Sequence, residues 1–397
     1  MKEENKKKGY VPNLRFPQFE GEWKKYKVSD VLEFFPTNSL SWDQLEYGTD
    51  NIYNLHYGLI HKGLPTQIEL DKCSLPNIRE ESGPKNYVFC KDGDVAFADA
   101  SEDTNDVGKV VEFLNCKNRN IVCGLHTIHG RDKNNLTIKG FKGYAFSSKV
   151  FRHQIRRLSQ GTKIYSISSK NFKDISIGIP SKEEQYKIAT LLRLLDERTA
   201  TQNKIIEDLR LLKSTISNLL LRNPNWKKYK IKDIGELGRG RVISTTEIKS
   251  QQTPKYPVYS SQTSNNGIMG YLDTYAFEGE YLTWTTDGAN AGTVFYRKGK
   301  FNCTNVCGTI KVNDQHNPYF VSQCLQLVTR KYVSTDLANP KLMNNTMASI
   351  EITLPDKETQ EFISDLLWCI DEKYSLENEL VSRHMDVKKY LLSNLFA

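Results

Sequence analysis

The chain has 397 residues, which is enough for two or three domains that each bury a core of their own. Its 11% of aromatic residues argue against a disordered protein, and its eight scattered cysteines favour reduced thiols over disulfides. The net charge of +8 permits a polyanionic partner without requiring one. No run of eighteen apolar residues occurs and no apolar segment follows the lysine-rich start, so we expect a cytoplasmic protein.

The first 179 residues predict a tail followed by a β-rich domain. Residues 1–12 are polar and lysine-rich, and we expect them to be flexible. Residues 13–179 contain short β-type runs separated by Gly and Asn, which is typical of a β-rich domain. This domain ends in a strand whose alternation places three apolar residues on one face, namely Ile175, Ile177 and Ile179.

Residues 180–222 predict one long helix after Pro180. Ser181 is placed to cap this helix, and Glu184, three residues later, completes the pattern of a capping box. Apolar residues recur at steps of three and four and form an amphipathic stripe, which includes Ile188, Leu192, Leu195 and Leu209. At 1.5 Å per residue, about forty residues make a rod of roughly 60 Å.

The second half of the chain repeats this order of elements. The segment Trp226–Ile234, at the start of a second β-rich segment (residues 223–354), is similar in sequence to Trp23–Val31. Residues 355–397 predict a second long helix with an apolar stripe that includes Ile363, Leu367, Ile370 and Leu391. We therefore predict an α+β fold with two β-rich domains in pseudo-repeat, separated by two long helices packed as an antiparallel coiled coil. The alternative is that each helix packs only on its own domain.

Signatures of catalysis are missing from the sequence. It has no G-x-x-x-x-G-K-[ST] phosphate loop, no G-x-S-x-G elbow and no H-E-x-x-H pair. Asn317-Pro318-Tyr319 superficially resembles a methyltransferase motif, but no cofactor loop accompanies it, and we interpret it as a turn before a strand. One group suits zinc by residue type but matches no common finger spacing, namely Cys116, Cys123, His126 and His129. We expect buried thiols, surface histidines and no metal there, with zinc as the alternative.

The positive signal is electrostatic. From Lys133 to Lys173 the chain holds ten Lys and Arg residues and no Asp or Glu. Such a field attracts phosphates through counterion release, and Arg can also bridge O6 and N7 of guanine. The second β-rich segment has amide-rich loops at 260–267 and 287–292, whose Asn and Gln can pair with adenine. The alternatives are a solvated basic face and ordinary turns.

A sequence motif made of a strand, a proline and the start of a helix occurs twice in the chain. With this repeated motif, the chain resembles the specificity subunit of type I restriction-modification systems. Its first copy contains the isoleucine strand, Pro180, Glu184, Gln185 and Ile188. Its second copy contains the strand Ile350–Leu354, Pro355, Gln360 and Ile363. Thr359 stands where the first copy has Glu184, which we interpret as a difference in helix capping. The resemblance covers nearly the whole chain after residue 12.

The resemblance implies that each β-rich domain is a target-recognition domain that reads one half of an asymmetric, bipartite site in double-stranded DNA. The helices would set the spacing between the half-sites and dock two methyltransferase subunits, which carry S-adenosylmethionine and the adenine-N6 chemistry. Restriction subunits would add an ATP- and Mg-dependent motor-nuclease. The chain itself would hold no cofactor and catalyse nothing.

With this function, we expect DNA contacts from basic and amide side chains of both domains, namely Arg152, Arg156, Arg157, Lys163, Asn265, Asn266, Asn290, Arg297 and Lys341. Two other functions remain open from the residues. One is a stand-alone DNA methyltransferase or nuclease with its own recognition domain, which stoichiometric binding of S-adenosylmethionine would favour. The other is a coiled-coil scaffold for protein partners, which a DNA affinity insensitive to salt would favour.

Overall fold

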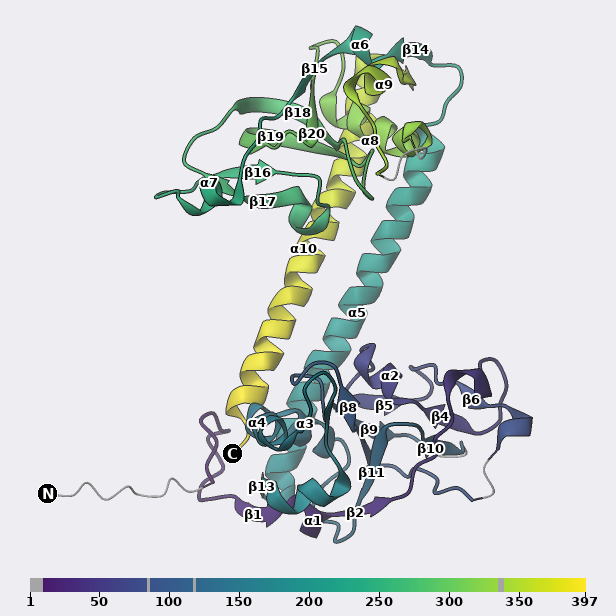
Figure 1. The fold of residues 1–397 in the computed structure, drawn as a ribbon, viewed down its shortest axis with the longest axis vertical. Coiled ribbons are helices and arrows are strands. Elements are labelled where there is room, and N and C mark those ends of the chain that lie inside the picture. The colour runs from purple at the N-terminus through teal and green to yellow at the C-terminus, as the bar shows by residue number, and fades with distance from the viewer. Residues whose placement is uncertain (1–9, 84–85, 117–118, 335–338) are drawn as a thin grey trace, which may run out of the picture. The chain divides into compact units, whose positions relative to one another are not determined.

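The computed structural model describes residues 10–83, 86–116, 119–334 and 339–397 and divides the chain into two compact units (Figure 1). Unit 1 contains the chain up to Asn203 together with Glu379–Ala397, and unit 2 is Lys204–Asn378. Most of the expected tail lies outside the described residues, but Tyr10 accepts a backbone hydrogen bond from Trp23 at 2.7 Å. Across the described ranges, no helix is both long and apolar enough to cross a membrane.

Unit 1 is built on a five-stranded sheet that contains β2 (Leu32–Phe35), β5 (Gln67–Glu69), β7 (Val95–Ala98), β9 (Val110–Leu114) and β11 (Thr127–Asp132). The hydrogen-bonded order is β2-β11-β7-β9-β5, with β5 parallel to β9 and the other pairs antiparallel. Every residue of β7 is buried, as expected for a central strand covered on both faces.

Three smaller sheets complete the strands of unit 1. A four-stranded sheet contains β3 (Leu45–Glu46), β4 (Tyr53–Leu55), β6 (Asn77–Ile78) and β10 (Ile121–Cys123). Two-stranded sheets pair β8 (Ala100–Ser101) with β12 (Tyr165–Ser166), and β1 (Lys24–Lys27) with β13 (Ser176–Ile179). The expected isoleucine strand is therefore β13, and its partner is the first strand of the unit.

The short helices of unit 1 are α1 (Val28–Val31), α2 (Tyr57–His61), α3 (Lys142–Ser147) and α4 (Lys149–Leu158). Helices α1, α3 and α4 share a core with Val95 and Phe97 of β7, whereas α2 packs with Ala96 and Ala98 on the opposite face. Phe97 of β7 packs against Phe146 of α3 and Phe172, with ring centroids 5.2 and 4.9 Å away. Phe151 of α4 joins this cluster, 4.8 Å from the ring of Phe146. Burial of each such aromatic side chain contributes about 1.5–3 kcal/mol, which fixes α3 and α4 on the sheet.

Unit 2 contains a six-stranded sheet with β15 (Gly235–Arg239), β16 (Tyr256–Tyr259), β17 (Ile268–Leu272), β18 (Phe277–Thr285), β19 (Val294–Cys303) and β20 (Cys307–Val312). A separate pair is formed by β14 (Lys227–Lys230) and β21 (Glu351–Leu354). The short helices are α6 (Ile231–Ile234), α7 (Thr245–Lys249), α8 (Pro318–Val328) and α9 (Asn344–Ser349).

The interpretation of Asn317-Pro318-Tyr319 as a turn before a strand is wrong, because these residues begin α8. The side chain of Asn317 accepts a hydrogen bond from the backbone N–H of Phe320 at 3.0 Å and thereby caps the helix. Pro318 occupies the first helical turn, where its missing N–H costs nothing. The motif is therefore the start of a helix, and its Tyr319 is buried.

The two units repeat one topology. The strand order β15-β20-β18-β19-β16 of unit 2 corresponds to β2-β11-β7-β9-β5 of unit 1, and in both the last pair is the parallel one. The closing pairs also match, because Tyr26 faces Ile177 and Tyr229 faces Ile352. The first and last strands of each globular segment are hydrogen-bonded to each other, so each segment closes before the chain enters a long helix. The predicted pseudo-repeat of two β-rich domains is confirmed.

The two long helices are α5 (Lys182–Leu220) and α10 (Lys357–Asn394). Oγ of Ser181 accepts from the N–H of Glu184 at 3.3 Å, as predicted for a cap. The capping box is incomplete, however, because the carboxylate of Glu184 instead pairs with Arg15 at 2.7 Å. At the start of α10, Asp356 accepts from the N–H of Thr359 at 2.9 Å, so capping does not need a Glu at this position.

The helices meet within both units and run antiparallel. In unit 1, the first part of α5 shares a core with the last part of α10, and Lys388 pairs with Asp196 at 2.6 Å. In unit 2, the first part of α10 shares a core with the last part of α5, and Lys213 pairs with Asp371 at 2.7 Å. Most of the predicted stripe is buried, namely Ile188, Leu192, Ile363, Leu367, Ile370 and Leu391, whereas Leu195 and Leu209 are half-buried.

Matching polar contacts attach each globular segment to its helices. Gln185 is fully buried, and it accepts from the N–H of Ile138 at 2.9 Å and donates to the carbonyl of Pro180 at 3.0 Å. Gln360 repeats these roles with Asn317 at 2.9 Å and Pro355 at 2.9 Å. The hydroxyl of Tyr144 in α3 donates to Asp196, and the hydroxyl of Tyr319 in α8 donates to Asp371. These two aspartates are the ones that form the ion pairs between the long helices.

Candidate nucleic-acid interface

The most basic helix of unit 1 is α4. Its apolar face is buried through Phe151 and Ile155, and Ser148 caps it by accepting from the N–H of Phe151 at 3.3 Å. Arg156 and Arg157 lie in its last turn and are exposed. The amphipathic pattern thus turns two guanidinium groups toward solvent, where phosphates could reach them.

Asn105 organises two of the predicted DNA-contacting arginines. Arg156 donates to its side-chain oxygen at 2.9 Å, and Arg152 donates to its backbone oxygen. Arg152 is partly buried, and this burial, with the nearby charge of Arg156, lowers the pKa of Arg152 to about 10. Its Nη1 has no hydrogen-bond partner among the described residues. Lys163 is exposed on the loop between α4 and β12, so it is not part of this group.

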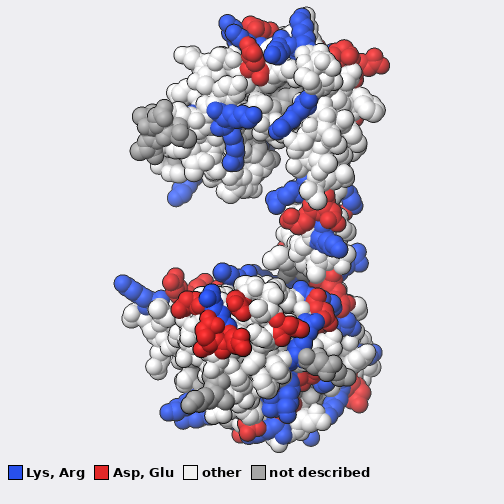
Figure 2. All heavy atoms as spheres, turned by 90° about the vertical axis from the view of Figure 1, so that its right-hand side faces the viewer, with Lys and Arg blue, Asp and Glu red and all other residues white. Residues whose placement is uncertain are grey.

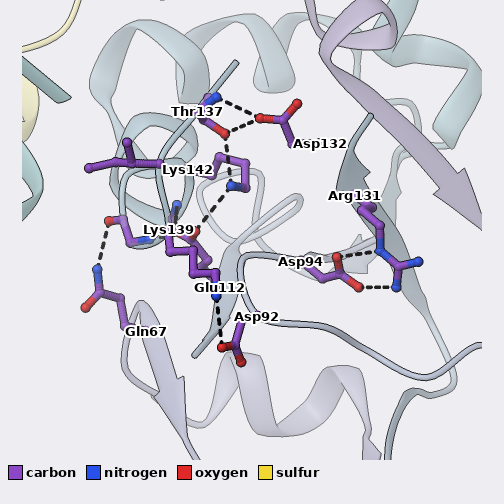
Figure 3. Close-up of polar contacts among 12 residues, drawn as sticks. Gln67, Asp92, Asp94, Glu112, Arg131, Asp132, Thr137, Lys139 and Lys142 are labelled. Carbon is purple, nitrogen blue, oxygen red and sulfur yellow. Dashed lines mark hydrogen bonds and ion pairs between the residues drawn. The ribbon is translucent and has the colours of Figure 1, made fainter. Parts of the chain in front are cut away.

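The acid-free segment of the sequence is less basic in space than its composition indicates, because acids from other segments neutralise part of it (Figure 3). Lys139 pairs with Asp92 at 3.1 Å. Lys142 is buried 3.4 Å from Glu112 and donates to Thr137 at 2.9 Å. Figure 2 shows a gathering of Asp and Glu among the Lys and Arg on one face of unit 1. Two of the ten cations of this segment, Lys139 and Lys142, are therefore neutralised by acids, and four of the remaining eight lie in α4.

Glu112 holds the backbone that leads into α3. It is fully buried and accepts from the N–H groups of Gly140 at 2.8 Å and Gly143 at 2.7 Å. Burial raises the pKa of Glu112 above its ordinary value, although the Lys142 ammonium and these N–H groups oppose that rise. Lys142 thus compensates a buried carboxylate, and it is not available to a phosphate.

The loop Ser264–Gly267 of unit 2 presents Asn265 and Asn266 to solvent. Both have positive φ, at 49° and 52°, a conformation that Asn tolerates better than most residues. Arg297 connects this loop to the sheet, because it donates to the backbone oxygen of Asn266 at 2.9 Å and to Oγ1 of Thr283 in β18 at 3.2 Å. Only 4% of Arg297 is exposed, so it positions the asparagines and does not itself reach outward.

A second loop of unit 2 centres on Asp287. Lys341 lies 3.8 Å from its carboxylate, and Arg239, at the end of β15, lies 3.4 Å from it. The backbone oxygen of Asn290 accepts from the hydroxyl of Thr293 at 2.8 Å, which shapes the turn and leaves the amide side chain half-buried. Arg239 was missed by the sequence analysis, because it lies outside the amide-rich loops and the acid-free segments.

The turn between β19 and β20 connects the two loops. Thr304 in this turn lies 3.5 Å from the hydroxyl of Ser260, and its N–H donates to the carbonyl of Tyr259 at 2.8 Å. On the other side, Thr286 donates its N–H to the carbonyl of Val306 at 3.0 Å. The turn is therefore hydrogen-bonded to residues next to both amide-rich loops, and its Asn305 is exposed.

The four residues considered for zinc are not one group. His126 is exposed and bonds to Asp99 at 3.0 Å. Cys116, Cys123 and His129 are buried, so the expectation of a surface histidine is wrong for His129. The alternation of β11 turns its side chain inward, against the ring of Phe35.

Comparisons with known proteins agree with this architecture. A family model described as type I restriction modification DNA specificity domain matches residues 20–211 and 223–382. The protein named "Putative type I specificity subunit S.MpnORF365P" of Mycoplasma pneumoniae is 36% identical over 233 residues, 57% of this chain and 85% of the relative. The type I restriction enzyme MpnII specificity subunit of the same organism is 36% identical over 201 residues, 49% of this chain and 60% of the relative.

The fold also matches a solved structure. The crystal structure of the S subunit of a type I restriction-modification system from M. genitalium superposes with a TM-score of 0.67 at 16% identity and covers 98% of this chain and 99% of that one. A low identity of this kind supports the fold alone. The family model, by contrast, spans most of the chain and matches both β-rich segments. The chain belongs to the type I restriction-modification DNA specificity family.

Proposed function

We propose that this chain is the non-catalytic DNA specificity subunit of a type I restriction-modification complex. Residues 13–179 and 223–354 act as two target-recognition domains, and residues 180–222 and 355–397 act as the spacer helices, after a tail at 1–12. The observation that carries this proposal is the repeated strand order under different loops. One scaffold with two different loop sets suits the reading of two unlike half-sequences.

The DNA-facing groups we propose come from the loops and from α4. In unit 1 these are Arg156 and Arg157, with Arg152 and Lys163 at the flanks. In unit 2 they are Asn265, Asn266 and Asn290, with Lys341 beside them. Exposed asparagines suit bidentate contacts with adenine, and arginines suit phosphates or guanine. Arg297 contributes by holding the asparagine loop in place.

Two methyltransferase subunits are the partners we propose for the long helices, joined in the full complex by restriction subunits. S-adenosylmethionine, ATP and Mg would be bound by these partners. Equivalent positions of the two helices expose apolar side chains, in the pairs Leu191 with Leu366 and Leu212 with Val387. Apolar groups at matching positions of a pseudo-repeat suit two copies of one partner.

The test of the spacer role is an insertion that lengthens both helices. Four residues, about one turn, would be added between Asn203 and Lys204 in α5 and between Asn378 and Glu379 in α10. The complex with the methyltransferase subunits is then used to methylate genomic DNA, and the methylated adenines are mapped. We expect the same two half-sequences with a gap longer by roughly two base pairs.

A control insertion of four glycines in the loop between β17 and β18 leaves the helices unchanged, and we expect the gap to stay as in the original chain. If lengthening the two helices changed the half-sequences themselves, the proposal that the loops read the bases and the helices set only the spacing would be wrong. Methylation that no longer depends on this chain at all would contradict the specificity role.

A second prediction concerns the charge of α4. In the methyltransferase complex, Arg156→Gln with Arg157→Gln is expected to weaken DNA binding for all sequences about equally. The slope of log affinity against log salt should fall by about 0.9 for each phosphate that the variant no longer neutralises. Lys228→Gln is the control, because Lys228 is an exposed residue of β14 in unit 2, outside both the long helices and the proposed DNA-facing groups. Equal slopes for the unaltered chain, the double variant and the control would mean that Arg156 and Arg157 do not contact DNA phosphates.

A further inference from the structure

A group of buried metal-ligating side chains lies inside unit 1, away from α4. The sulfurs of Cys90 and Cys123 are 3.6 Å apart. These sulfurs and a ring nitrogen of His129 all lie within 4.8 Å of one another, and all three residues are buried. Cys90 is held beside β10 by donating its N–H to Ile121 at 2.8 Å, Cys123 ends β10, and His129 lies in β11. Three separate segments thus converge on one point.

His129 has one ring nitrogen bound to a carboxylate and the other without a partner among the described residues. Nε2 of His129 lies 2.7 Å from a carboxylate oxygen of Asp94. Arg131 holds the same carboxylate through two contacts of 2.7 and 2.8 Å, which Figure 3 shows. The other ring nitrogen, Nδ1, is buried and has no hydrogen-bond partner among the described residues. An Nε2–H donated to Asp94 leaves the lone pair of Nδ1 free. Metal-binding histidines commonly donate their second N–H to a carboxylate in this way.

We propose that Cys90, Cys123 and His129 bind a zinc ion. The ion would link the four-stranded sheet of unit 1, through Cys123 of β10, to its five-stranded sheet, through His129 of β11. Zn–S bonds of about 2.3 Å in a tetrahedral site place two sulfurs about 3.8 Å apart, close to the observed separation. Binding deprotonates both thiols, and the two protons pass to solvent. The site is structural, because the ion would be enclosed by the core and far from any exposed substrate position.

Cys116 is the candidate for the fourth position, and because its sulfur is not among the atoms that lie within 4.8 Å of one another, it would have to move toward the ion. It belongs to the same hydrophobic cluster as Cys90 and Cys123, and its N–H is held by Asp92 at 2.7 Å. A Cys₃His set is a common composition for structural zinc. Unit 2 offers a natural comparison, because it has the buried pair Cys303 and Cys307, while Thr309 in β20 takes the strand position that His129 has in β11. Within the part of the chain that the structure describes, a group of three such ligands therefore occurs in unit 1 and not in unit 2.

The first test uses the full chain without DNA or partner subunits, so that its failure would leave the specificity function untouched. Zinc is measured by mass spectrometry after purification without chelators, and we expect about one ion per chain. Replacement by Co²⁺ is expected to give the visible bands of a tetrahedral site and the near-ultraviolet bands of thiolate ligation. A folded chain that takes up neither ion and has all eight thiols free would overturn the proposal.

The second test uses variants. Cys123→Ser and His129→Gln are expected to lower the zinc content at least about tenfold and to remove the cobalt bands, whereas Cys303→Ser is the matched control and should retain both. Should the first two fail to fold, chelation of the unaltered chain supplies the measurement, with a lower melting temperature expected and its recovery on addition of zinc. A Cys303→Ser chain that loses the metal, or a chelated chain that melts unchanged, would contradict the assignment. A disulfide between Cys90 and Cys123 in the freshly purified chain would also contradict it.

Discussion

Changing Leu192 to Asp is expected to unfold unit 1. Leu192 has no exposed surface and lies in the core that α5 shares with the end of α10 and the main sheet. Loss of a buried leucine costs about 2–5 kcal/mol, and an unpaired carboxylate in its place costs more. This sum is comparable to the net stability of about 5–15 kcal/mol of a whole domain. Urea unfolding of the full chain, followed by circular dichroism, measures the loss.

Leu194→Asp is the matched control for this change, because Leu194 lies two residues further along the same helix and is 54% exposed. Its effect on the free energy of unfolding should stay within about 0.5 kcal/mol. In the proposed complex, however, Leu194→Asp places a charge on the surface offered to a methyltransferase subunit, so capture of that subunit should weaken. Equal unfolding midpoints for the two variants would mean that α5 is not part of the core.

The sequence predicted the helices well because their signal is local. Ser181 and the apolar stripe depend on spacings of three and four residues, and α5 begins at Lys182. The repeated sequence segments also predicted the pseudo-repeat, because similar segments in the same order form corresponding strand pairs, here β1–β13 and β14–β21. What periodicity could not provide was the polar attachment of the helices. The contact of Asp196 with Tyr144 joins residues that are 52 apart in the chain. Asp196 belongs to the motif that occurs twice, but no spacing pattern links it to Tyr144.

The candidate sites were harder to predict because their side chains come from distant strands. The zinc candidates were selected as sequence neighbours, which included the exposed His126 and omitted Cys90, 33 residues before Cys123. Arg297 illustrates the same limit. Its charge suggested a DNA contact, but its burial depends on Tyr259 from another strand, whose ring lies 3.6 Å below the guanidinium. Burial of a charged residue follows from tertiary packing, which composition does not reveal.

Arg297→Met is expected to relax the sequence read by unit 2 and to leave the half-sequence read by unit 1 unchanged. The loop of Asn265 and Asn266 holds two consecutive residues at positive φ, and Arg297 binds the backbone oxygen of Asn266. Methionine fills part of the space over Tyr259 but cannot donate that hydrogen bond. A loop free to move loses the fixed geometry that bidentate base contacts need, and each base pair so read contributes about 1–3 kcal/mol of discrimination.

The measurement is a map of methylated adenines made with the variant complex, together with its affinity for sites altered in one half. We expect discrimination to fall about tenfold or more at the positions read by the asparagine loop. Lys298→Met is the control, because Lys298 is the next residue of β19, its side chain is 70% exposed and it pairs with Glu280. That variant should keep both half-sequences, since the loop and its support stay intact. Relaxation of both half-sequences by Arg297→Met, or of neither, would show that the asparagine loop does not read the DNA bases independently of unit 1.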